Sequence, residues 1–374
     1  MNPQRFISQC LLFGAFALTL LATDVRVDAQ TPGLPDSLNA NITGGFGALV
    51  YALAPQPDGK TLVAGNFTSV YGTPRSNIAR LNADGTLDAS FDPRPNGTIY
   101  TVAVQADGKV LIGGQFTSLQ PNGASSTSCQ HIARLHADGT VDLAFRPRVN
   151  DRINSIALQA DGKILVGGPF TTLQPTGATG PLSRYFVARL ESDGTQDDSF
   201  LPTPNFTVHS LLVQEDGGVL IGGQFETLRS TGSDTLFPRQ GIARLTAGGM
   251  VDPDFDPNPK GTVFSMAVQA DGRILLGGLF SSIQPNRTGL ASSRSNLARV
   301  NADGTLDIAF RADPESWVQP CRAGQRRDSD RWQLSNKFVH APHRLDPDEL
   351  GRDSRHQLPR SQSQPQHPGN CTAS

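Results

Sequence analysis

The chain has 374 residues, of which 18% are charged and 37% hydrophobic, and its formal net charge is −2. This length is enough for two ordinary domains or for one repetitive domain with a large buried core. The near-neutral charge gives no electrostatic reason to expect a nucleic acid or an anionic membrane surface as a partner.

Residues 1–29 have the features of a secretory signal peptide. Arg5 precedes an apolar run from Leu11 to Ala22, and the small residue Ala29 precedes the expected cleavage ahead of Gln30. The run is shorter than the roughly 20 residues that span a bilayer. We therefore expect cleavage rather than a retained anchor, no membrane span afterwards, and a secreted, periplasmic or cell-surface protein.

The segment LPDSLNANITGG, residues 34–45, is similar to the end of a later repeat, LDASFDPRPNG, residues 87–97. A chain that begins at this point of its repeat supplies an N-terminal strand to its last blade. We therefore expect this strand to close the ring and to leave no exposed sheet edge.

A sequence phrase recurs five times, and it defines repeats 1 to 5. Its turn glycines are Gly59, Gly108, Gly162, Gly217 and Gly272, with spacings of 49, 54, 55 and 55 residues. A period near 50 is typical of β-propeller blades rather than of helical repeats. Each repeat carries four segments with strand character, which in repeat 2 are residues 98–105, 109–116, 131–136 and 140–145.

The first two segments of each repeat are predicted to form a three-residue hairpin. In repeat 2 the turn Gln105–Lys109 places Val104 opposite Val110 and Val102 opposite Ile112. Both faces are apolar, as a blade between two neighbours requires. The Gly113–Gly114 pair is followed by more strand, which argues against a phosphate loop and favours a bulge or close blade packing.

The third and fourth segments are joined by a turn of the same kind, which places an Arg opposite an Asp in every repeat. A set of five copies favours a structural pair over a catalytic one, and a buried pair costs about 3 kcal/mol to break by removing one partner. The predicted pairs are Arg80–Asp88, Arg134–Asp142, Arg189–Asp197, Arg244–Asp252 and Arg299–Asp307.

The phrase VQADGKVLIGGQF…IARLHADGTVDLAF resembles the delta-60 repeat of bacterial secreted and surface proteins. The resemblance extends roughly from Leu34 to Phe310. It implies a β-propeller in an extracellular compartment, and it supplies no catalytic residues.

Variable polar loops follow the second strand of each repeat, on the face opposite the Asp-Gly turns. Variable loops on a rigid scaffold are natural ligand contacts. The side chains most suited to a sugar or a peptide are Arg184, Tyr185, Phe237, Arg239 and Arg287. The alternative is that each is a solvated or locally packed loop residue.

The remaining motifs predict no catalytic residues, no cofactor and no metal. Asp252, Asp254 and Asp256 are spaced as in a calcium loop, but the glycine and glutamate of such a loop are missing. The histidines lack metal-binding spacing, and no G-x-S-x-G motif is present.

The repeat pattern stops after Phe310, and residues 317–374 are rich in Arg, Gln, Ser, Pro and His. Shifting the frame by one base through Cys321 to Leu334 permits AVQANGAILIGGNF, with a turn glycine at codon 326, in register with Gly272. We therefore expect an out-of-frame sixth blade. The alternative is a disordered tail.

The sequence thus predicts an all-β propeller over residues 30–316, with five complete four-stranded antiparallel blades and an incomplete sixth. Its expected role is that of a non-enzymatic binding or structural module for an extracellular glycan or protein. The alternative is a glycan hydrolase or lyase with its site at the central opening. An enzyme would need a residue that breaks the repeat symmetry on an inner strand, and His209 is the one candidate there.

Overall fold

The computed structural model describes residues 42–44 and 48–311, which form strands joined by turns and two short 3₁₀ segments, Pro121–Gly123 and Pro285–Arg287. Within these ranges no helix has the length and apolar character needed to cross a membrane. The signal peptide, residues 34–41 and the tail from residue 312 lie outside the described residues. The predictions made for them remain predictions.

Each repeat forms one antiparallel inner sheet of three strands, in which the second strand is central. The sheets are β1 (Leu49–Pro55), β2 (Thr61–Asn66) and β5 (Ile78–Leu81); β6 (Ile99–Val104), β7 (Val110–Gly114) and β10 (Ile132–Leu135); β12 (Ser155–Leu158), β13 (Ile164–Gly167) and β16 (Val187–Leu190); β18 (Val208–Val213), β19 (Val219–Gly223) and β22 (Ile242–Leu245); and β23 (Pro259–Val268), β24 (Ile274–Ile283) and β26 (Leu297–Val300).

Short outer strands continue each repeat beyond its inner sheet. They are β3 (Ser69–Val70) with β4 (Thr73–Pro74); β8 (Ser118–Leu119) with β9 (Thr127–Ser128); β11 (Arg148–Val149), β14 (Thr172–Gln174) and β15 (Leu182–Ser183); β17 (Thr203–Pro204), β20 (Thr227–Arg229) and β21 (Leu236–Pro238); and β25 (Ser292–Ser293), which pairs with β24.

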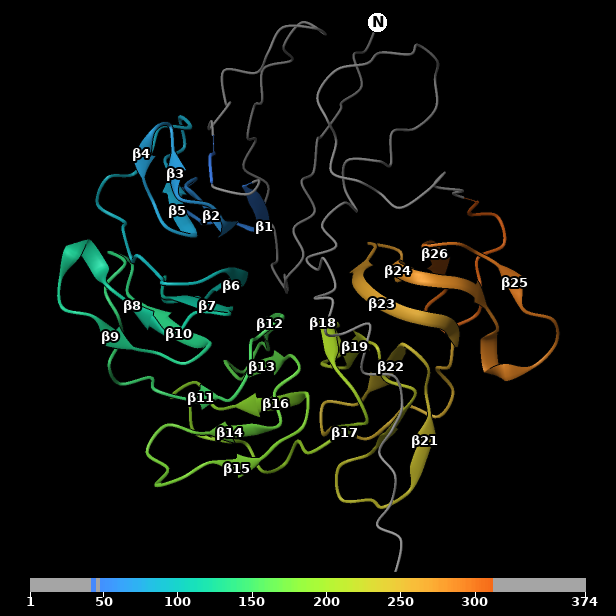
Figure 1. The fold of residues 1–374 in the computed structure, drawn as a ribbon. Helices are drawn as coiled ribbons and strands as arrows, with labels where there is room; N and C mark the ends of the chain where they lie inside the picture. Colours follow the sequence, from blue (N-terminus) through green and yellow to red (C-terminus); the bar gives the residue numbers. More distant parts are fainter. Residues whose placement is uncertain (1–41, 45–47, 312–374) are drawn as a thin grey trace, which may run out of the picture. The chain divides into compact units, whose positions relative to one another are not determined.

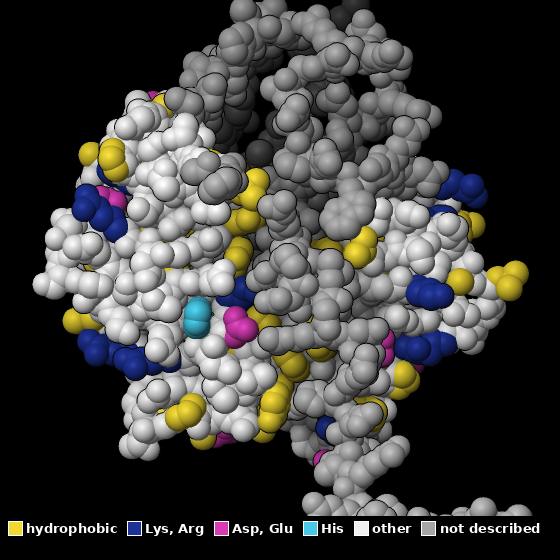
Figure 2. Space-filling model, viewed as in Figure 1, with side chains coloured by type: hydrophobic (Ala, Val, Ile, Leu, Met, Phe, Trp, Pro, Cys, Tyr) yellow, Lys and Arg dark blue, Asp and Glu magenta, His cyan; other side chains and the backbone are white. Residues whose placement is uncertain are grey.

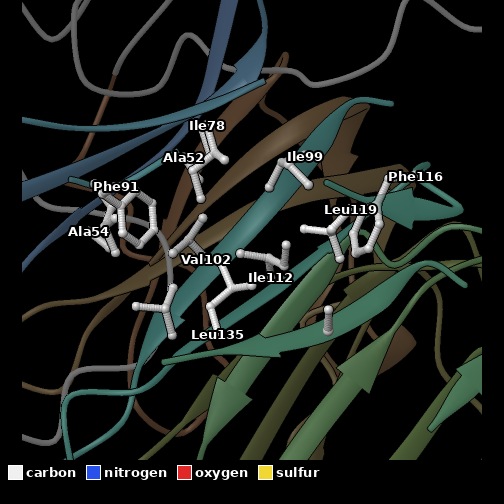
Figure 3. Close-up of a cluster of buried hydrophobic side chains, with 14 residues drawn as sticks. Ala52, Ala54, Ile78, Phe91, Ile99, Val102, Ile112, Phe116, Leu119 and Leu135 are labelled. Atoms are coloured by element: carbon white, nitrogen blue, oxygen red, sulfur yellow. The ribbon is translucent and has the colours of Figure 1, made fainter. Parts of the chain in front are cut away.

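The first strands of the five inner sheets contact one another in chain order, β1 with β6, β6 with β12, β12 with β18, and β18 with β23. In Figure 1 these strands lie nearest the centre. Buried side chains fill the space between successive sheets. In Figure 3, Ala52 and Ile78 of repeat 1 pack with Val102 and Ile112 of repeat 2.

The predicted hairpin register is confirmed. Val104 pairs with Val110 and Val102 with Ile112, and Gly108 has φ +80° in the turn. The Gly113–Gly114 pair serves both predicted purposes: Gly113 allows close packing of the next blade, and Gly114 lies beside a bulge. A Cβ on Gly113 would lie 2.6 Å from Ile153 Cγ2 of the next repeat, and one on Gly114 would lie 2.1 Å from the Thr98 carbonyl oxygen beside a bulge.

The fourth predicted strand is not a strand in these blades. In repeat 2 it contributes one bridge, Leu135 to Val141, and then turns. The Asp142 carboxylate accepts a hydrogen bond from the Ala144 amide, and its carbonyl accepts one from the Phe145 amide. Because this local hydrogen bonding competes with strand pairing, the residue that pairs with Arg134 also ends the strand.

The N-terminal segment differs in part from the expected ring closure. Thr43 pairs with Ser69, so it belongs to repeat 1 rather than to the last blade. Its equivalent in repeat 2 is Pro95, which pairs with Leu119. Within the described ranges no strand pairing joins the sheet of repeat 1 to that of repeat 5.

Candidate ligand-binding site

The structure brings together all five predicted Arg–Asp pairs, with shortest side-chain N–O distances of 2.7–2.9 Å. In repeat 3 the side chains of Arg189 and Asp197 are both 5% exposed. Each guanidinium also lies over an aromatic ring, 4.4–4.7 Å from its centroid. The rings are those of Phe91, Phe145, Phe200, Phe255 and Phe310.

A second cation contacts the same carboxylate in most repeats, a contact that the sequence analysis missed. Lys109 Nζ lies 3.1 Å from Asp142 and Lys163 Nζ lies 2.7 Å from Asp197. Burial alone would raise the pKa of Asp142, but hydrogen bonds from Lys109, the Ala144 amide and Arg134 lower it to about 2. The Asp142 carboxylate accepts three hydrogen bonds from the protein, so most of its acceptor capacity serves the blade rather than a substrate.

The five loop candidates do not gather into one site. Arg239 is 6% exposed and donates to the carbonyls of Pro238 and Pro253, while Arg287 donates to Asp256 at 3.1 Å. Phe237 packs against the core of repeat 4.

The other two candidates, Arg184 and Tyr185, are adjacent in sequence and differ in exposure. Arg184 donates to the Ser183 carbonyl and to Asp198, whereas Tyr185 is 45% exposed. Of the five candidates, Tyr185 and Arg287 are exposed, and the Arg287 guanidinium is already paired with Asp256.

The position of Arg239 holds an Arg in four repeats and Cys129 in repeat 2. Arg239 lies 3.6 Å from Asp256, and the equivalent Arg75 lies 3.8 Å from Asp92. In repeat 2 the position of the Asp holds Arg146. Burial raises the pKa of the Cys129 thiol to about 11, so this Cys packs as a neutral side chain beside the Arg that replaced the carboxylate.

The double variant Cys129→Arg with Arg146→Asp is expected to restore the pair found in repeats 1 and 4. Cys129→Arg alone places two guanidinium groups together and is expected to destabilise the protein. A double-mutant cycle from urea denaturation should give a favourable coupling of about 1 kcal/mol or more. Additive effects of the two substitutions would show that position 129 cannot hold the pair.

A row of residues with left-handed backbone marks where each third strand begins. They are Asn77 (φ +60°), His131 (+67°), Phe186 (+66°), Gly241 (+70°) and Asn296 (+64°). The carbonyl of each accepts a hydrogen bond from the second glycine of its repeat, as in Gly168 to Phe186. Asn, His and Gly tolerate this conformation, whereas a bulky Phe there is an outlier.

Phe186 stacks against an aromatic residue from the start of the next repeat. The ring centroids of Phe186 and Phe206 are 6.0 Å apart and their planes differ by 24°. Phe206 is 41% exposed, and the ring centroids of Tyr185 and Phe186 are 6.3 Å apart. We call Tyr185, Phe186 and Phe206 the aromatic platform.

The same two positions at the previous junction hold His131 and Asp151. Burial lowers the pKa of His131, while the Gly114 carbonyl and the Asp151 charge act in the opposite direction. On the face seen in Figure 2, a His side chain lies close to an acidic one, with hydrophobic side chains nearby. The corresponding pairs at the junctions of repeats 1–2 and 4–5 are Asn77 with Gly97 and Gly241 with Gly261.

A second row that breaks the repeat symmetry lies on the innermost strands. Its members are the bulged or equivalent residues Tyr51, Tyr100, Asn154, His209 and Phe264. The rings of Tyr51 and Tyr100 are 5.2 Å apart, and His209 meets Phe264 edge to face at 4.9 Å. Asn154 Nδ2 lies 3.3 Å from His209 Nδ1.

Neither row was predicted from the sequence, apart from His209 in the second row and the loop candidate Tyr185 beside Phe186 in the first. An alignment of the five repeats at the residue before the third strand contains the missing signal. Four of the five residues there suit a left-handed backbone and Phe186 does not.

No three His, Cys, Asp or Glu side chains in residues 42–44 and 48–311 gather in a way that would hold a metal ion. In the acidic run, Asp252 pairs with Arg244, and Asp256 pairs with Arg239 and Arg287.

Four segments, residues 56–91, 105–145, 159–200 and 269–310, match the family model described as "Domain of unknown function (DUF5122) beta-propeller". With the sheet topology above, these matches establish an all-β chain with propeller repeats. The narrower delta-60 resemblance remains a prediction.

Among solved structures, a protein of unknown function from Bacteroides caccae is 12% identical, with a TM-score of 0.34. The alignment covers 70% of this chain and 81% of the other chain. A gluconolactonase from Xanthomonas campestris is 16% identical, with a TM-score of 0.39 and coverages of 71% and 76%. The WD40 propeller domain of Doa1 is 12% identical, with a TM-score of 0.37 and coverages of 72% and 84%. No curated protein matches the chain.

Proposed function

We propose that this protein is a secreted, non-enzymatic propeller that binds an extracellular glycan at the aromatic platform. The observation that carries the proposal is Phe186, a bulky residue at φ +66° stacked on the exposed Phe206. Such a backbone conformation costs of order 1–3 kcal/mol and is concentrated at functional sites. Since the other repeats use Asn, His or Gly here, the fold itself does not need an aromatic ring at this position.

The surroundings of the platform suit a sugar. Aromatic faces offer a large apolar contact area to the C–H face of a sugar ring. The preceding junction carries charged and imidazole side chains, Asp151, Arg152 and His131, which are donors and acceptors for the hydroxyl groups of a glycan that extends beyond the platform. The signal-like residues 1–29 support a location where glycans are exposed to solvent, whether secreted, periplasmic or at the cell surface.

Phe206→Ala is expected to weaken glycan binding at least tenfold, because it removes the exposed ring of the stack. A glycan array with the full chain selects the ligand, and calorimetry with that ligand gives Kd for the variant. The matched control is Leu236→Ala, which removes an apolar side chain that is 52% exposed on an outer strand. Equal affinities for both variants and the parent, or no array signal, would contradict the proposal.

A second candidate function is a glycan hydrolase or lyase, which the imidazole of His131 near Asp151 favours. A His and a carboxylate are a common acid–base combination. A hydrolysis screen on the array ligands separates the two functions. Turnover that is lost in His131→Asn, with binding retained, would replace the binding proposal by the enzymatic one.

A further inference from the structure

We propose that the sheet of repeat 5 is a docking surface for one further repeat of the same kind. Four successive repeat-to-repeat junctions in this molecule use the same contacts. Those contacts define what a partner for the fifth repeat must carry.

We call the Arg of each Arg–Asp pair the strut Arg, and the Phe whose ring lies against its guanidinium the strut Phe. The first recurring contact is a hydrogen bond from the strut Arg to the following repeat. Arg80 Nη1 donates to the Ala137 carbonyl at 2.5 Å, and Arg134 Nη1 donates to the Ser192 carbonyl at 2.5 Å. The remaining two of these bonds join Arg189 to Ala247 and Arg244 to Ala302. Every acceptor is the second residue of the turn that follows the third strand, as Ala137 is in the turn from His136 to Thr140.

The second recurring contact brings the turn glycine of one repeat onto the strut Phe of the repeat before it. A Cβ added at Gly139 would lie 3.1 Å from the Phe91 ring, and one at Gly194 would lie 2.9 Å from the Phe145 ring. Gly249 with Phe200 and Gly304 with Phe255 repeat this approach, at 3.0 and 3.1 Å. A Cβ at these separations would be crowded, and each of the four glycines has a left-handed backbone, φ +79° to +87°, so the position favours glycine.

Repeat 5 has the donor half of the junction without its acceptor. Within residues 42–44 and 48–311, Arg299 donates to Asp307 and to Gln269 Oε1, and to no turn carbonyl. Phe310 is half-buried, whereas the four preceding strut Phe side chains are buried. In the same part of the chain, the carbonyl of Ala83 in the turn of repeat 1 accepts no hydrogen bond.

A further repeat supplies both missing groups, a turn carbonyl for Arg299 and a strut Arg for Ala83. The shifted reading of codons 321–334, AVQANGAILIGGNF, has the first hairpin of such a repeat, with its turn glycine 54 positions after Gly272. That distance matches the spacing of the preceding repeats, so the occupant argued for is a sixth copy of this repeat.

The test inserts a copy of residues 147–201 into the full chain between Arg311 and Ala312, with a scrambled sequence of the same composition as control. The copied insert is expected to raise the urea midpoint above that of the scrambled insert. Arg299→Met is expected to lower the folding equilibrium constant at least tenfold more with the copied insert than without it. Arg134→Met, at a complete junction, should have the same effect in both chains.

An equal midpoint for copied and scrambled inserts, or loss of folding with the copied insert alone, overturns the proposal. An effect of Arg299→Met that is the same with and without the copied insert also overturns it. Glycan affinity, measured in parallel, distinguishes failure of this inference from failure of the proposed function.

Discussion

Asp197→Asn is expected to lower the free energy of unfolding by about 3–5 kcal/mol, the range for breaking a buried ion pair by removing one partner. The Asp197 carboxylate accepts hydrogen bonds from Arg189 and Lys163 at one oxygen and from the Ser199 amide and hydroxyl at the other. The neutral amide leaves Arg189 buried without its counter-charge. Urea denaturation of parent and variant measures the loss.

Asp252→Asn is the matched control in repeat 4. The Asp252 side chain is 24% exposed, and Gly218 stands where Lys163 stands in repeat 3. Water therefore replaces more of the lost interaction, and we expect about 1 kcal/mol, as for a solvent-exposed ion pair. If Asp197→Asn costs no more than Asp252→Asn, the strut does not gain strength from burial.

Acid is expected to unfold the protein between about pH 5 and pH 2. Burial alone would raise the pKa values of Asp88, Asp142 and Asp197, but hydrogen bonds from Lys, Arg and local donors outweigh it and hold all three well below the usual Asp range. A carboxyl group with a lowered folded-state pKa binds more protons when unfolded. Its contribution to the free energy of unfolding is therefore complete above the unfolded-state pKa of about 4. The contribution is lost as the pH falls toward the folded-state pKa.

A folded-state pKa of about 2 for Asp142 corresponds to a contribution of roughly 2–3 kcal/mol to the free energy of unfolding at neutral pH. Urea midpoints measured at pH 7, 5, 4 and 3 should be nearly constant down to pH 5 and should then fall. In Asp142→Asn the decrease below pH 5 should be smaller, because one titrating group is gone. A midpoint at pH 3 equal to that at pH 7 would contradict the account of these carboxylates.

The hairpin register and the Arg–Asp pairing were predictable because both depend on residues close together in sequence. A turn of fixed length places Val104 opposite Val110 whatever surrounds it, and the same rule places Arg134 beside Asp142. The prediction of a fourth strand failed for a local reason. The Asp that completes the pair also hydrogen-bonds the Ala144 amide and turns the chain away from the sheet.

The candidate site was less predictable, because its residues come from different repeats. Phe186 and Phe206 are 20 positions apart and meet only where one inner sheet packs on the next. Arg239 looked like a ligand contact from its place in a polar loop, yet it is buried on backbone carbonyls.

By itself, the sequence determined the repeat and its period, because the recurring phrase shows both directly. It also determined the turns and the charge pair inside each unit, because these follow from the backbone geometry of one short hairpin. Only the tertiary structure decided which side chains of neighbouring units touch, and hence where the aromatic platform lies and which junction contacts recur. The physical reason is that contacts between sheets depend on how closely the backbones approach, and glycine positions such as Gly113 and Gly194 set that distance.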